Sequence, residues 1–89
     1  MNSKHLLRVE QLFLQSRYTE ARTHLETHLS EYPTDFFGRK LYIITLLQCE
    51  EKDKARQLCE QLLAEYPEEE DVIMLSAEID MLDLSLIHI

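Results

Sequence analysis

Glycine and proline are nearly absent from this chain, which has one Gly and two Pro among its 89 residues. An all-β fold needs many turns, so this scarcity favours long helices. A single glycine also excludes a glycine-rich phosphate loop. No window stays apolar for the roughly 18 residues that a membrane-spanning helix needs, and residues 1–10 lack the features of a secretory signal. We interpret the chain as a cytoplasmic protein.

Basic residues are scarce in the second half of the chain. Residues 1–40 carry a net charge of +1 and residues 41–89 a net charge of −9, which together give the chain's −8. A nucleic-acid binder needs a basic stripe that displaces counterions, and the sequence has none. The acidic half would repel phosphate and anionic lipid, so neither nucleic acid nor a membrane is expected as a partner. A partner that is steered by charge should be basic.

The apolar residues, 45% of the chain, belong to a sequence that repeats itself at a spacing of 34. Ala21-Arg22 recurs as Ala55-Arg56, and Glu31-Tyr32-Pro33 recurs as Glu65-Tyr66-Pro67. A fixed period of 34 is the signature of a helix–turn–helix unit that stacks on copies of itself. Such units usually hold a partner rather than catalyse a reaction.

Apolar spacing close to 3.6 residues predicts five helices. We expect Thr19 to cap the second helix and Asp35 to cap the third, because both residue types accept hydrogen bonds at helix starts. Gly38 lies inside the third helix, where a glycine often marks a close crossing of two backbones. The expected helices cover about residues 3–15, 19–32, 36–50 and 53–65, with the fifth starting within 68–71.

These residues resemble the tetratricopeptide repeat family. Its unit has a small residue early in the second helix, an apolar residue four positions later, and a proline at the end. The matching residues here are Ala21, Leu25 and Pro33, then Ala55, Cys59 and Pro67. The resemblance covers about residues 3–83, within a repeat domain at 1–84 that comprises units at 2–34, 36–68 and 70–84, the last incomplete.

This sequence departs from the family's pattern at several positions. Ser16 and Glu50 replace the turn glycine, and Val9 and Ile43 stand where the first helix of a unit has a small residue. The aromatic residue before the small residue is Tyr18 in the first unit. In the second unit a lysine takes its place, so the motif within each unit is degenerate.

The resemblance implies an all-α, right-handed superhelix of antiparallel helix pairs, with a concave groove lined by the first helix of each pair. It implies a non-catalytic protein–protein interaction module that holds a peptide or helix of a partner. The groove positions are mostly apolar, which suits an amphipathic helix or an extended apolar segment rather than a terminal carboxylate. The expected groove residues are Leu6, Glu10, Phe13, Phe37, Lys40, Leu41, Ile44, Gln48, Met74 and Glu78.

The fifth helix has no second helix to pair with, because the chain stops at Ile89. We therefore expect Leu75, Ile79 and Leu82 to be exposed and to be candidates for self-association. Three explanations stay open. The chain is a fragment of a longer repeat protein, or it forms a homodimer through this helix, or the apolar tail at residues 85–89 is not natural and resembles a translated sequencing adapter.

His24 and His28 are one turn apart on the second helix, with Glu20 one turn earlier, which is metal-ligand geometry in principle. The repeat register argues against a metal site, because Leu58 and Leu62 stand at the two matching positions of the second unit. A polar substitution on a partly buried face is the preferred interpretation. We expect no metal and no cofactor.

The remaining polar candidates have simpler interpretations. One interpretation of Cys49 and Cys59 is a disulfide between them. A buried thiol is the preferred interpretation of Cys59, because it replaces an apolar core residue of the first unit. One interpretation of the acidic run Glu68–Asp71 is that it recruits a basic peptide. The preferred interpretation needs no partner, because negative charge is favourable at the start of a helix. No catalytic constellation is present, so no enzyme activity is expected.

Overall fold

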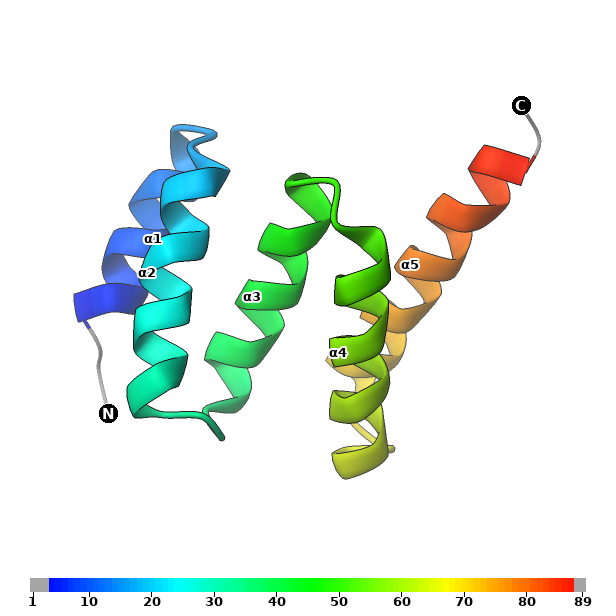
Figure 1. Ribbon diagram of the computed structural model, residues 1–89. Helices are drawn as coiled ribbons and strands as arrows, with labels where there is room; N and C mark the ends of the chain where they lie inside the picture. Colours follow the sequence, from blue (N-terminus) through cyan, green and yellow to red (C-terminus); the bar gives the residue numbers. More distant parts are fainter. Residues whose placement is uncertain (1–3, 88–89) are drawn as a thin grey trace. The chain divides into compact units, whose positions relative to one another are not determined.

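The computed structural model describes the backbone of residues 4–87 and the side chains of residues 7–81. Within that range the regular structure is helical throughout (Figure 1). The chain divides into two compact units, unit 1 at residues 1–51 and unit 2 at residues 52–89. The five helices are α1 (Lys4–Leu14), α2 (Tyr18–Glu31), α3 (Phe36–Gln48), α4 (Lys52–Glu65) and α5 (Glu70–Ile87).

The turns after α1 and α3 share one conformation, 34 residues apart. Ser16 and Glu50 have positive φ angles of 58° and 64°. In each turn the next amide closes the helix end: Arg17 N–H donates to the Leu12 carbonyl, and Glu51 N–H donates to the Leu46 carbonyl. This is the Schellman arrangement, which favours glycine at the left-handed position. Ser16 and Glu50 therefore adopt the left-handed conformation that a glycine would adopt at this position. This conformation costs about 1 kcal/mol at each of the two residues.

The starts of α2 and α3 differ in how they are capped. The expectation that Thr19 caps α2 is wrong, because α2 begins at Tyr18 and Arg17 occupies the cap position without a side-chain hydrogen bond. The closed turn at Ser16 brings Arg17 directly to the helix start, and Ala21 N–H donates to the Arg17 carbonyl. The expected cap at Asp35 is confirmed, since its side chain accepts from Gly38 N–H at 3.0 Å.

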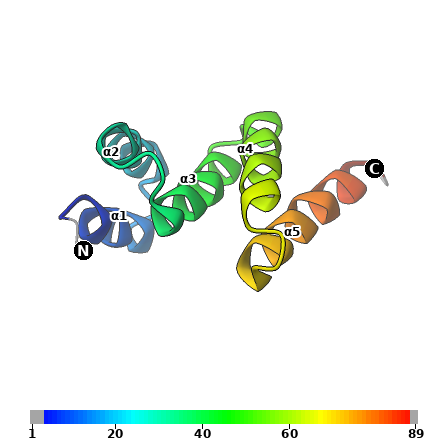
Figure 2. The same cartoon turned by 90° about the horizontal axis from the view of Figure 1, so that it is seen from below.

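Unit 1 is built around α2, which packs against both α1 and α3. Figure 2 shows α1 and α2 lying against each other, with α3 beside them. The centre of this unit is fully buried and comes from α1 and α2. Its members, called here the unit 1 core, are Val9, Leu12, Ala21 and Leu25.

Unit 2 is an antiparallel hairpin of α4 and α5, which pack against each other (Figure 1). The buried residues of α4 are Ala55, Cys59 and Leu62, in the same register as the buried Ala21, Leu25 and His28 of α2. The repeat of 34 thus places equivalent positions in the interior of both units. The described part of α5 continues through Ile87, past the expected end of the repeat domain at residue 84.

The expected exposure of the α5 stripe is wrong for Leu75 and Ile79. Both side chains are buried, together with Val72. These positions face one side of α5, and that side meets α4 within unit 2. Leu82 lies outside the described side chains, so the expectation stays a prediction at that position alone.

Candidate functional site

The expected groove residues divide between the two units. Eight of them belong to α1 and α3 of unit 1, and Met74 and Glu78 belong to α5 of unit 2. Leu6 lies outside the described side chains. Within unit 1, the exposed members are Glu10, Phe37 and Gln48, and the half-buried members are Phe13, Lys40, Leu41 and Ile44.

Two of the groove residues also support the interior. Phe13 and Leu41 are partly buried and pack against the unit 1 core. The Phe13 ring also meets the Tyr18 ring edge-on, with 5.6 Å between centroids. A charge placed at Leu41 would therefore disturb the fold as well as any bound partner. Leu41 is a poor position for testing binding alone.

Phe37 is the apolar side chain of this set that is most available to a partner within unit 1. It is 43% exposed although it is a large aromatic residue in the first turn of α3. The ammonium of Lys40 lies 5.8 Å from the centre of its ring and 5.3 Å from that of Phe36. Such cation–π contacts hold a ring in place at modest energy, about 0.5–1 kcal/mol at exposed sites. The Phe37 ring is thus an exposed aromatic side chain that is held in position by Lys40.

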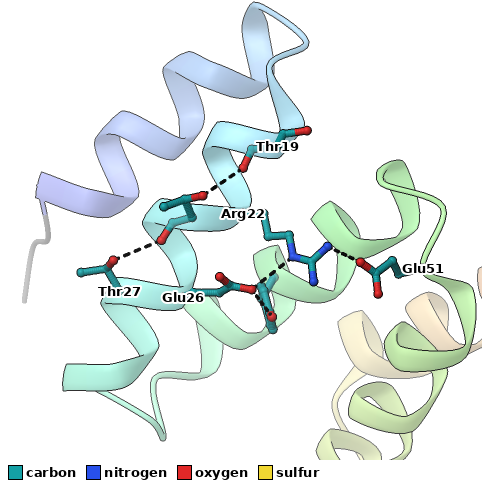
Figure 3. A network of polar contacts seen from close by, with 7 residues as sticks. Thr19, Arg22, Glu26, Thr27 and Glu51 are labelled. Carbon is teal, nitrogen blue, oxygen red and sulfur yellow. Dashed lines mark hydrogen bonds and ion pairs between the residues drawn. The ribbon is translucent and has the colours of Figure 1, made fainter.

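The repeated arginines form polar links that the sequence analysis did not identify. In unit 1, Arg22 of α2 donates to Glu26 at 3.1 Å and also to Glu51 beyond the end of α3 (Figure 3). The Tyr42 hydroxyl donates to the same Glu26 carboxylate at 2.9 Å. In unit 2, Arg56 of α4 donates to Asp80 of α5 at 3.0 Å. The sequence signal was the recurrence of Ala-Arg at 34 residues.

These links act on structure rather than on chemistry. The hydrogen bonds from Glu51 and then from Glu26 raise the pKa of Arg22 above its ordinary value. An arginine that is already charged at every physiological pH gains no new reactivity from this shift. The alanine before each arginine is fully buried. Arg22 joins α2 to Glu51 after α3, and Arg56 joins α4 to Asp80 of α5. The repeated pair therefore combines close packing with a polar tether.

His28 has a structural environment. The ring is 3% exposed, its Nε2 lies 2.7 Å from Asp35 Oδ2, and it contacts the Tyr32 ring at 5.2 Å between centroids. A Cβ added at Gly38 would lie 2.9 Å from His28 Cδ2 and 2.8 Å from Asp35 Oδ2. The close approach expected at Gly38 is therefore present, but it is to side chains rather than to a second backbone.

No metal-binding group emerges from the described side chains, where no three His, Cys, Asp or Glu residues come together. The acidic run at 68–71 is exposed and leads into α5, whose first turn contains Glu70 and Asp71. Negative charge is favourable at that helix end because of the helix dipole.

Cys59 lies in a small recess between α4 and α5. The recess has a volume of about 240 Å³, and Arg56, Cys59, Glu60, Leu63, Ser76, Ile79 and Asp80 line it. Burial raises the pKa of the Cys59 thiol, and the nearby charges of Asp80 and Glu60 raise it further. Cys49 is half-buried by comparison. The recess thus surrounds a thiol whose reactivity is lowered by burial and by its raised pKa.

Iodoacetamide should modify Cys59 more slowly than Cys49 in the native protein, because Cys59 is buried and its raised pKa lowers the fraction of reactive thiolate. Raising the pH should accelerate the modification of Cys59, because a larger fraction of its thiol is then in the thiolate form. Peptide mass spectrometry over a time course measures the two rates. Equal native rates would contradict the burial of Cys59, and equal rates in denaturant are the control.

Comparison with known proteins identifies the family. A family model for the tetratricopeptide repeat matches residues 12–79, and the chain belongs to that family. The predicted all-α repeat fold is confirmed. Neither curated proteins nor solved structures give a match. Among the described residues, none of the helices has the length and apolar character needed to span a membrane.

Proposed function

We propose that unit 1 holds an apolar segment of a partner protein on the outward surface of α1 and α3. Tetratricopeptide repeats mediate protein–protein interaction, and this chain carries the repeat over most of its length. The observation that supports the particular surface is the 43% exposure of Phe37, whose ring is positioned by Lys40. The protein would act by holding its partner, without catalysis.

The side chains of this surface favour an apolar ligand. Phe37, Leu41 and Ile44 follow one face of α3 at spacings of four and three residues. Glu10 and Gln48, two polar members of the expected groove, are exposed. An amphipathic helix or an extended segment would present alternate apolar side chains to such a surface. Covering the exposed part of the Phe37 ring would contribute about 2 kcal/mol.

Phe37→Glu should weaken binding of a selected peptide at least about tenfold, because a carboxylate would replace the central apolar contact. The probe is a phage-displayed library of random peptides, panned against the immobilised chain. Enriched peptides are synthesised, and their affinities for the wild type and the variant are measured by fluorescence anisotropy. We expect the enriched sequences to be apolar or amphipathic.

Thr23→Glu is the matched control, because it adds the same charge at an exposed position on α2. It should change the affinity by less than about twofold, as surface changes outside an interface usually do. Circular dichroism verifies that both variants remain helical. Failure to enrich any peptide, or equal affinity for wild type and Phe37→Glu, would contradict the proposal.

Self-association through Leu75 and Ile79 is not part of this proposal. Both side chains are buried within unit 2, so they have no surface to offer a second copy. The homodimer expected through the fifth helix stays a prediction at Leu82, and light scattering tests it.

A further inference from the structure

An apolar strip follows the outer side of α5 in unit 2. It lies opposite the buried side of the helix, which is formed by Val72, Leu75 and Ile79. Met74 and Met81 are 62% and 65% exposed, unusually high values for large apolar side chains two turns apart on one helix. Its described members are Ile73, Met74, Ala77 and Met81, called here the α5 strip.

Acidic residues border the α5 strip on both sides. At 3.6 residues per turn, Asp80 falls along one edge, and Asp71 and Glu78 fall along the other. Asp80 is held in place by Arg56 of α4 at 3.0 Å. The strip is therefore an apolar surface between two negatively charged borders.

Apart from Arg56, which pairs with Asp80, unit 2 has few positive charges near the strip in sequence. The sequence has no Lys or Arg after Arg56. Unit 2 contains ten Asp and Glu against three Lys and Arg, a net charge of −7, whereas unit 1 is close to neutral at −1. The strong negative potential of the chain is thus concentrated on the unit that carries the exposed methionines.

We propose that the α5 strip is a second docking surface, which binds a cationic amphipathic helix of a partner protein. The apolar side of that helix would cover Ile73, Met74 and Met81, and its lysines or arginines would meet the acidic borders. Complementary charge on both borders selects this occupant. Methionine side chains adapt to differently shaped apolar surfaces, which suits a helix laid along them.

A second copy of this chain is a poorer occupant. Two α5 strips brought face to face would place Asp71 and Glu78 of each copy close to acids of the other. Like charges at an interface disfavour association. The inference concerns α5 of unit 2, where Met74 and Glu78 were expected as groove residues, and it gives that part of the expected groove a partner of its own. It does not depend on the surface proposed around Phe37, so each can fail without the other.

The test uses a fluorescent synthetic peptide of about 16 residues, long enough for a helix of several turns, made only of leucine and lysine with leucine at helical spacing. One comparison peptide has the same composition in scrambled order, and another has glutamate in place of lysine. Anisotropy titration should show binding of the helical lysine peptide at least about tenfold tighter than that of the scrambled one. Binding should weaken from about 50 to 500 mM salt, and the glutamate peptide should not bind.

The variant M74S/M81S should weaken binding of the helical lysine peptide at least about fivefold, since both side chains are exposed contact residues. Leu14→Ser is the matched control in unit 1, because Leu14 is 88% exposed at the end of α1 and belongs to neither proposed surface, and it should change the affinity by less than about twofold. A separate variant, Phe37→Ser, reports any binding of the peptide to the surface around Phe37. Glu78→Lys tests the acidic border independently and should also weaken binding of the helical lysine peptide. It keeps the inference testable if the methionine variant does not fold.

Three results would overturn the inference. Equal binding of helical and scrambled peptides would reduce the effect to diffuse negative charge. Loss of binding in Phe37→Ser but not in M74S/M81S would place the site in unit 1. A dimer that M74S/M81S dissociates, without binding of the lysine peptide, would make the strip an interface between copies. The first and third results leave the proposed role of Phe37 to its own test, whereas the second would support binding at Phe37.

Discussion

Leu25→Ala should lower the free energy of unfolding by about 2–5 kcal/mol, the usual range for emptying a buried leucine site. Leu25 is fully buried in α2, the helix that packs against both α1 and α3. Its loss would leave a void in the unit 1 core that the other three members cannot fill without moving the helices. Small domains have total stabilities of only about 5–15 kcal/mol, so the variant should be near the limit of folding.

Urea unfolding followed by far-ultraviolet circular dichroism measures this effect. Leu14→Ala is the matched control, because Leu14 is 88% exposed at the end of α1. It removes the same atoms and should change the stability by less than about 0.5 kcal/mol. Similar losses in the two variants would show that Leu25 is not at the centre of unit 1.

Asp35→Ala should lower the stability by about 2 kcal/mol or more, because two favourable contacts are lost together. The Asp35 carboxylate accepts from Gly38 N–H at the start of α3 and lies 2.7 Å from His28 Nε2. Removing it leaves a helix end without its cap and a buried imidazole without that partner. Asp35→Asn keeps an acceptor oxygen at the cap and should be less damaging.

A double-mutant cycle separates the two contributions. If the contact between His28 and Asp35 is energetically important, the loss in the combined variant H28A/D35A should be smaller than the sum of the single losses by about 0.5 kcal/mol or more. Additive losses would show that Asp35 acts through the helix cap alone. The measurement is again equilibrium unfolding of the four proteins.

The sequence was sufficient to predict the helices, because their signals are local. Apolar spacing and the residues before Pro33 and Pro67 located five helices, and Asp35 was correctly assigned as a cap. Thr19 was assigned wrongly because the turn at Ser16 determines where α2 starts, and that turn conformation overrides a side-chain preference. The right-handed superhelix stays a prediction.

Tertiary contacts were harder to predict. Leu75 and Ile79 were expected to be exposed because the fifth helix lacks a second helix of its own pair. Their side of α5 instead packs against α4 of the preceding pair. The link from Arg22 to Glu51 depends on the reach of a long side chain across 29 residues of sequence. The groove residues remain a prediction. The same apolar residue types occur in a core and on a binding surface, so the sequence does not distinguish the two roles at half-buried positions such as Leu41.

The most direct test of the proposed function is a map of amide chemical shifts by two-dimensional NMR, recorded with increasing amounts of a peptide selected from the library. The account predicts that the largest changes fall on α3, at Phe37, Leu41 and Ile44, while the outer side of α2 at Thr23 and Thr27 is unaffected. Changes centred on α2, or no change at saturating peptide, would contradict it.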